Sequence, residues 1–186
     1  MLDKKQRDML ELPYGMELKG EVSFKKDAYK TNLTFKEDKA LVKLDGSYQS
    51  QSEDYQISVS IDSLQPNHFM PKDSLYWLTA SAAIKGKGFD LYSARTSSLL
   101  QATISDIKYG RNSVSEIQLN GRLKNHAYEL QLESGYPLAL LKASVSGILQ
   151  RNKAEMNLDA QIEHLNLYRL HFVDVPLSTA FRFEAI

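Results

Sequence analysis

The chain has 186 residues, enough for one sizeable domain or for several stacked repeats with a continuous core. Lys and Arg together number 23, as do Asp and Glu, so the formal net charge is zero and we expect no nucleic-acid partner. The absence of cysteine excludes disulfides, thiolate catalysis and cysteine-ligated metals.

Residues 1–15 contain Leu2, Met9 and Leu10 but no sustained alternation, and we expect them to form a lead-in or linker. They lack the apolar stretch of a signal peptide, and no segment of the chain has the roughly 20 apolar residues that a membrane-spanning helix needs. Any export signal or membrane anchor is therefore expected to lie outside this sequence. Residues 16–186 are expected to form a single repeat-built unit.

From Met16 onward the dominant sequence period is two. Leu18, Val22 and Phe24 alternate with polar residues, which predicts a strand with one dry and one wet face. The same alternation recurs at residues 42–48, 55–61, 76–84, 100–104, 117–123, 128–132, 143–149 and 156–162. Alternation of this kind is typical of antiparallel strands, because parallel strands covered on both sides have continuous apolar runs.

Polar segments of hairpin length separate these predicted strands. They lie at residues 25–28, 37–39, 49–54, 124–127 and 150–154. Residues 65–74 contain Pro66 and Pro71 and are predicted to form a longer crossover loop.

An internal repeat underlies the alternation: apolar-x-Gly-x-apolar, a polar turn, a second alternating strand, and an apolar-x-x-apolar step. Its glycines are Gly20, Gly46, Gly121 and Gly147, and its closing steps lie at residues 61–64, 104–107 and 162–165. A glycine among inward-facing apolar residues suits a strand that bends. The recurrence predicts a sheet that curves in the same way at each unit.

Several less repetitive segments resemble TamB-like proteins of Bacteroidota, within the AsmA-like superfamily. The segments are LPYGMELKG at 12–20, HFMPKDSLYWLTA at 68–80, KGKG at 85–88, LNLYRL at 165–170 and VDVPL at 173–177. The resemblance covers most of the chain from Leu12 onward. It identifies the sequence as an internal segment, without the N-terminal membrane helix and the C-terminal domain of that family.

The resemblance implies an all-β fold: an elongated, curved antiparallel sheet with one apolar concave face, which forms an open groove built from hairpin repeats. It implies a periplasmic location in the cell envelope, with the parent protein anchored in the inner membrane by a helix outside this segment. The implied role is outer-membrane biogenesis, through phospholipid transport along the groove, outer-membrane protein assembly, or both. The implied partners are phospholipid acyl chains, an outer-membrane barrel protein of the TamA or BamA type, and neighbouring repeats of the parent chain.

The residues expected to line the lipid groove share the inward parity of the alternation. They are Leu18, Val22, Phe24, Val42, Leu44, Tyr48, Tyr55, Ile57, Val59, Ile61, Leu78, Ile84, Ile104, Leu119, Leu123, Tyr128, Leu130, Leu132, Val145, Leu149, Leu158 and Ile162. Core packing is the simpler interpretation of the aromatic members, since each ring buries a large apolar area. In a one-layer curved sheet both interpretations can hold.

No motif points to catalysis, a cofactor or a metal site, and we expect the chain not to be an enzyme. The histidines are widely spaced and are expected to be structural or exposed; they are His68, His126, His164 and His171. The spacing of Gly86 and Gly88 matches the start of a dinucleotide-binding motif, but the third glycine of that motif is missing. We expect this segment to form a turn at the end of a strand. Glu53 and Asp54 lie in a polar turn, where solvation explains them.

An alternative function is a self-contained lipocalin-like barrel or sandwich that binds a small apolar ligand in a closed cavity. A weaker alternative is an enzyme built on a β-sandwich. The sheet edges distinguish the barrel from the groove, because a closed barrel has no free edge whereas a groove segment exposes both terminal strands.

Overall fold

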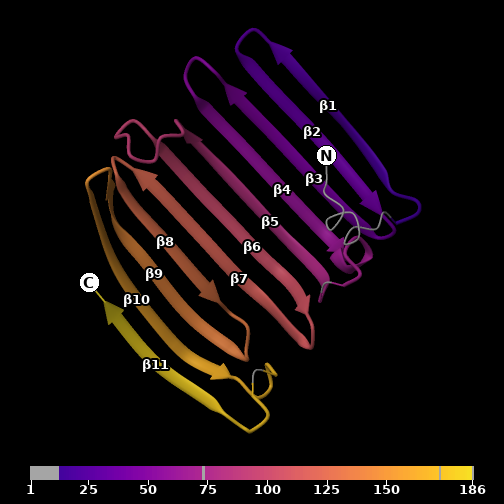
Figure 1. The fold of residues 1–186 in the computed structure, drawn as a ribbon, viewed down its shortest axis with the longest axis vertical. Helices are drawn as coiled ribbons and strands as arrows, with labels where there is room; N and C mark the ends of the chain where they lie inside the picture. The colour runs from indigo at the N-terminus through magenta and orange to yellow at the C-terminus, as the bar shows by residue number, and fades with distance from the viewer. Residues whose placement is uncertain (1–12, 73, 172, 186) are drawn as a thin grey trace.

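A computed structural model describes residues 13–72, 74–171 and 173–185, and these form one antiparallel sheet of eleven strands (Figure 1). Each strand pairs with its neighbours in sequence, so the spatial order runs from β1 to β11 without a crossover. The strands are β1 (Glu17–Lys25), β2 (Ala28–Glu37), β3 (Ala40–Gln49), β4 (Asp54–Leu64), β5 (Leu75–Lys87), β6 (Ser97–Tyr109), β7 (Asn112–Lys124), β8 (Ala127–Ser134), β9 (Ala139–Gln150), β10 (Lys153–Asn166) and β11 (Ser178–Ala185). The prediction of an all-β antiparallel fold is confirmed.

The sheet is open. β1 and β11 lie at opposite edges and do not pair with each other, and the described residues contain no second sheet that could form a sandwich. The alternative of a closed lipocalin-like barrel or sandwich is therefore wrong for this part of the chain. The physical reason is that the curl of the sheet stops before its edge strands meet (Figure 1).

The hairpins all preserve the parity of the alternation. Leu44 of β3 lies opposite Leu33 of β2 on one side and Val59 of β4 on the other. Lys43, one residue earlier, lies between Thr34 and Ser60 on the opposite face. Because side chains alternate along a strand, this register collects apolar residues on one face and polar residues on the other.

The apolar-x-x-apolar steps of the sequence repeat are β-bulges. In β4, two residues between Ile61 and Leu64 lie opposite one residue of β5, so that Ile61 faces Ala80 and Leu64 faces Leu78. Equivalent register shifts follow Ile104 in β6 and Ile162 in β10. A bulge inserts one residue and bends the strand, so two apolar residues three positions apart stay on one face.

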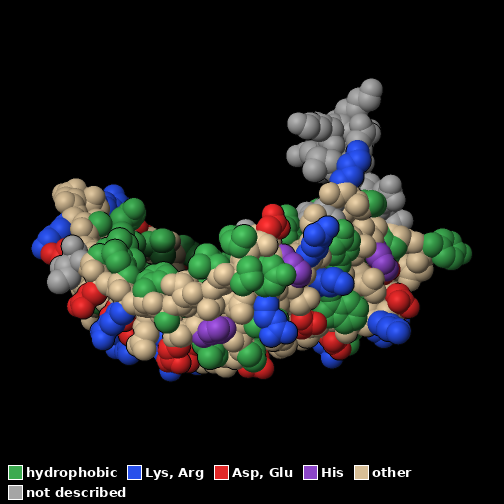
Figure 2. Space-filling model, turned by 90° about the horizontal axis from the view of Figure 1, so that it is seen from below, with side chains coloured by type: hydrophobic (Ala, Val, Ile, Leu, Met, Phe, Trp, Pro, Cys, Tyr) green, Lys and Arg blue, Asp and Glu red, His purple; other side chains and the backbone are tan. Residues whose placement is uncertain are grey.

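The sheet is curved, with its apolar face on the hollow side. Figure 2 shows hydrophobic side chains gathered within the hollow and charged side chains along the outer curve. The elongated curved sheet with an apolar concave face agrees with the prediction.

Segments outside the strands are short. The described part of residues 65–74 contains one 3₁₀ turn, Pro66–His68, and joins the neighbouring strands β4 and β5, so the prediction of a crossover at this loop is wrong. The described residues contain no α-helix. None of the described segments is a helix long and apolar enough to cross a membrane. Most of the predicted lead-in lies outside the described residues.

Glycines of the repeat occupy crowded positions on the hollow side. Gly121 lies opposite Leu100 and Leu130, and a Cβ atom added to it would come within 2.9 Å of the Leu130 side chain. At Gly147 an added Cβ would overlap the backbone carbonyl oxygen of Glu155 in β10. Backbone atoms cannot turn aside as a side chain can, so Gly147 is the less replaceable of the two.

We predict that Gly147→Ala destabilises the fold by about 1–3 kcal/mol, as overpacking does. Gly46→Ala should cost less, because its Cβ would meet only one methyl group of Thr31, at 2.8 Å. Urea unfolding measures both changes, and Ser146→Ala on the polar face is the matched control. Equal stability of all three variants would contradict the crowding at Gly147.

Candidate functional site

The candidate site is the hollow apolar face, which consists of side-chain rows that run across the strands. Paired residues of successive strands place each row's members side by side. One row, read from β1 to β11, contains Val22, Thr31, Gly46, Ile57, Ile84, Leu100, Gly121, Leu130, Val145, Leu158 and Ala185. A second contains Gly20, Leu33, Leu44, Val59, Ala82, Ala102, Leu119, Leu132, Ala143, Ala160 and Phe183.

No second layer covers these rows. Among the described hydrophobic residues only Ala40, Leu123, Ala139 and Leu170 are buried. Leu130 in the middle of the sheet remains 40% exposed, and Met156 of β10 remains 59% exposed. Monomeric soluble proteins seldom expose a continuous apolar surface of this kind unless it binds a partner or a ligand.

The strand pairing places all the predicted groove-lining residues on this face. They include Leu78 of β5, which lies opposite Leu64, and Leu149 of β9, which lies opposite Ala154. The sequence analysis left off the lining list several members of these two rows and of the next row, which begins at Leu18 and contains Val42, Ile61, Ile104 and Ile162. They are Leu33, Phe35, Leu100, Ile117, Leu141, Phe181 and Phe183. Phe181 and Phe183 alternate with polar residues near the end of the sequence, a signal that could have found them.

An aromatic cluster crosses the hollow near one set of strand ends. The ring centroids of Phe24 and Tyr29 lie 5.3 Å apart, and those of Tyr29 and Tyr48 lie 5.9 Å apart. Phe89, from the connection between β5 and β6, then contacts Tyr48 at 5.5 Å and stacks on Tyr55 at 5.1 Å. The loop thus contributes a ring to the apolar face.

Residues 88–96, which we call the strap, connect β5 to β6 and reach a distant part of the sheet. The carboxylate of Asp90 accepts a hydrogen bond from the Arg151 guanidinium, in the turn between β9 and β10, at 3.2 Å. Within the strap, the Thr96 hydroxyl donates to the Asp90 carbonyl at 2.6 Å. β5 and β9 are four strands apart, about 19 Å along a sheet at the usual spacing, so the ion pair joins parts of the chain that are distant within the sheet. Both side chains are exposed to solvent, and a pair of this kind contributes little to stability.

The carboxylate of Asp90 has its pKa lowered below the ordinary value, first by the backbone N–H of Tyr92 and then by Arg151. A depressed folded-state pKa contributes stability that is present above the unfolded pKa and is lost as pH falls through the folded one.

We predict that Arg151→Gln raises the pKa of Asp90 part of the way toward its ordinary value, because the Tyr92 hydrogen bond remains. Carboxyl-carbon NMR titration measures the shift, and Arg122→Gln on the outer face is the control. An unchanged Asp90 pKa would show that the ion pair with Arg151 does not form in solution.

At the other set of strand ends, His68 and Phe69 of the loop between β4 and β5 pack against β2. The Phe69 ring lies 5.7 Å from that of Phe35. Nδ1 of His68 lies 2.9 Å from the buried carboxylate of Glu37 and donates a hydrogen bond to it. The second carboxylate oxygen of Glu37 has no protein partner. The contact between His68 and Glu37 anchors the loop between β4 and β5 to β2.

We predict that His68→Ala destabilises the fold by about 1–3 kcal/mol, since it leaves the Glu37 carboxylate buried without its hydrogen-bond donor. The double variant with Glu37→Gln should recover part of the loss, because it removes the buried charge. Thermal unfolding compares the two, and a double variant less stable than His68→Ala would argue against this assignment.

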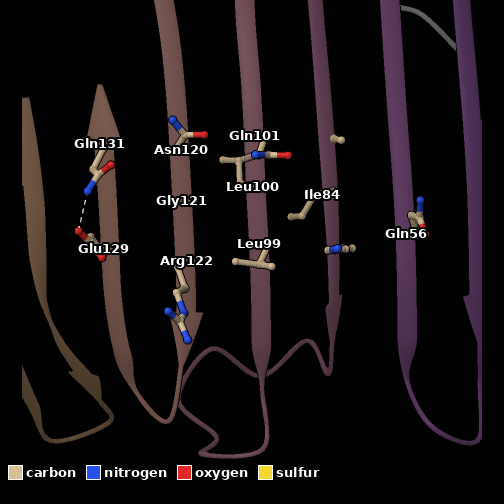
Figure 3. A pocket seen from close by; sticks show the side chains of 12 residues that line it. Gln56, Ile84, Leu99, Leu100, Gln101, Asn120, Gly121, Arg122, Glu129 and Gln131 are labelled. Carbon is tan, nitrogen blue, oxygen red and sulfur yellow. Dashed lines mark hydrogen bonds between the residues drawn. The ribbon is translucent and has the colours of Figure 1, made fainter. Parts of the chain in front are cut away.

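The outer face carries a shallow depression of about 490 Å³ over β4 to β8. Its polar side chains, which include Gln101, Asn120 and Arg122, lie side by side over neighbouring strands (Figure 3). Gln131 donates a hydrogen bond to Glu129 at 2.8 Å. The groups do not converge on one point, so the depression does not have the geometry of a nucleophile held against a base.

The remaining sequence candidates lie apart. His126 and His171 are in turns and His164 is in β10; within the described residues, no three His, Asp or Glu side chains are placed to hold a metal ion. Gly88 ends the β5 strand region with a positive φ of 72°, and its N–H donates to the Glu53 carbonyl at 3.1 Å. The interpretation of this segment as a strand-end turn agrees with that geometry.

Comparison of the chain with models of protein families, with curated proteins and with solved structures finds no match.

Proposed function

We propose that the hollow apolar face binds phospholipid acyl chains and that the chain is a groove segment of an envelope protein. The observation that carries the proposal is the continuous, uncovered apolar surface across all eleven strands. Such a surface needs a cover, and acyl chains provide one without polar contacts.

The size of the hollow suits an acyl chain. Side chains on one face of a strand repeat about every 6.6 Å, so the four successive inward positions of β4, which are Tyr55, Ile57, Val59 and Ile61, span about 20 Å. One leaflet of a bilayer's hydrocarbon region is about 15 Å thick, which sets the length of an ordered acyl chain. The rows are therefore wide enough to cover one chain laid along a strand.

The chemistry of the two faces supports movement of lipid along the groove. Contacts between Leu or Ile side chains and acyl chains are non-directional, so a lipid can shift between rows without breaking hydrogen bonds. The outer face is polar, with Lys43, Thr103 and Gln118 among its residues, and keeps the sheet soluble on that side. No catalytic residue is part of this function.

The cellular setting of the proposal comes from the resemblance to TamB-like proteins. It comprises a periplasmic location, an inner-membrane anchor outside the segment, and a role in outer-membrane biogenesis. Assembly of outer-membrane proteins with a barrel partner of the TamA or BamA type is the second role that the resemblance implies. Within the described residues both edge strands of the sheet lack a second neighbour, and an extended client segment can add to a strand of this kind.

We predict that a photocrosslinking residue at Val59 or Leu158 captures phospholipid from vesicles. The matched positions Ser58 and Asp159 lie next to them on the outer face and should capture far less. Mass spectrometry of the crosslinked chain gives the ratio. Equal capture at inward and outward positions would overturn the acyl-chain proposal.

Introduced charge gives an independent test. Val59→Asp and Leu158→Arg should each weaken capture at a crosslinker elsewhere in the hollow, because a charge beside acyl chains costs several kcal/mol. Circular dichroism must first show that each variant retains the strand content of the wild type. Undiminished lipid capture by the folded charge variants would favour protein docking over lipid binding.

A further inference from the structure

The outer edge of β1 is an unpaired strand edge with regular geometry. β1 pairs with β2 along all 9 of its residues without a register shift, and no other described strand pairs with it. All its residues are exposed, including Leu18 at 70% and Phe24 at 71%. Backbone N–H and C=O groups on such an edge can pair with a strand of another chain.

β1 has charged side chains on its outer face, Lys19 and Lys25 among them, which is one of the devices that protect an edge strand, but it lacks three others. It contains no proline and no bulge, and its apolar positions carry no inward-pointing charge. The opposite edge differs, because the pairing of β11 with β10 shifts register after Ile162. Each edge strand has an ion pair on its polar face, between Lys19 and Glu17 at 2.5 Å on β1 and between Arg182 of β11 and Asp159 of β10 at 3.1 Å. β1 is therefore the edge better suited to further pairing.

The charges along β1 complement each other when the strand meets a second copy of itself in antiparallel orientation. Its outer-face residues are Glu17, Lys19, Glu21, Ser23 and Lys25. If Gly20 lies opposite Gly20 of the second copy, each Lys19 faces a Glu21 and each Glu17 faces a Ser23. Directly opposite residues in an antiparallel pair are close enough for opposite charges to attract.

Neighbouring registers that keep the faces aligned are less favourable. Placing Lys19 opposite Lys19 of the second copy also sets Glu17 against Glu21. A shift in the other direction sets each Glu17 against a Lys25 of the other copy, but it also places Glu21 opposite Glu21, a like-charge pair that the register centred on Gly20 avoids. Like charges directly opposite each other destabilise a strand pair.

We propose that two copies of this chain associate through their β1 edges, as an antiparallel pair centred on Gly20. The two-fold axis is perpendicular to the sheet, so the apolar faces of both copies lie on the same side. Leu18 of each copy then lies opposite Val22 of the other and loses much of its exposure. The pairing joins two hollows into one surface, and it does not depend on what the hollow binds.

Sedimentation of the full 186-residue chain over a range of concentrations tests the pairing. The wild type should show a monomer–dimer equilibrium. Lys19→Glu should weaken it by about tenfold, because the two-fold axis creates two Glu–Glu oppositions. The double variant Lys19→Glu with Glu21→Lys should restore it, since the charges are exchanged. Lys43→Glu, the same change on β3 away from the edge, is the control and should have no effect.

Cysteine crosslinking tests the register, and the chain has no cysteine of its own to interfere. A mixture of Lys19→Cys and Glu21→Cys chains should form a covalent dimer on mild oxidation. A mixture of Lys19→Cys and Ser23→Cys chains should form much less, because those positions are directly opposite only in the shifted register. Equal or greater crosslinking of the second mixture would overturn the register.

Two outcomes would overturn the association itself. One is a wild-type chain that remains monomeric at every concentration at which it is soluble. The other is a dimer that persists in Lys19→Glu but dissociates in Arg182→Glu, which would place the contact at β11. Circular dichroism confirms in each case that the variant has the strand content of the wild type.

Discussion

Apolar and polar side chains stay on separate faces of this sheet only while every strand pair preserves the parity of the sequence alternation. Leu44 lies between Leu33 and Val59 because both hairpins around β3 pair residues of the same parity. A slip of one residue in either hairpin would set Leu44 beside polar neighbours and move a strand's apolar residues to the outer face. The hairpin turns and the bulges all satisfy this one constraint.

The β-bulges allow the strands to bend while the apolar side chains stay on one face of the sheet. Each bulge that bends a strand inserts one extra residue. That residue would move every later side chain of the strand to the opposite face unless the sequence pattern also shifts by one. The step from Ile61 to Leu64 provides the compensation, since it separates two apolar residues by three positions where the bulge absorbs one. The same arrangement follows Ile104 and Ile162, so the sheet bends repeatedly without mixing its faces.

The sequence was sufficient to predict most of the strands, their antiparallel pairing and most of the apolar face, because alternation such as that of Ile57, Val59 and Ile61 is a local property. The segments of β2 and β11 were not among the predicted alternations. The recurrence of the Ile61–Leu64 step was also visible, but its identity as a bulge depends on the partner strand. Phe89 and the ion pair between Asp90 and Arg151 could not be predicted in this way. They belong to a loop and a turn without periodicity, and 61 residues separate the two charged partners.

The serial order of the strands makes this protein close to a one-dimensional array, in which each strand is stabilised by the strands before and after it. The stability of such an array is approximately a sum of local and nearest-neighbour terms. Opening is therefore expected to begin at β1 and β11, which have one neighbour each, and to progress inward strand by strand. The contact between Asp90 and Arg151 departs from this order, because it couples β5 to the β9–β10 turn across the strands between them. Both side chains of this pair are exposed to solvent, so it adds little to stability, and the order of opening is still set by the contacts between neighbouring strands.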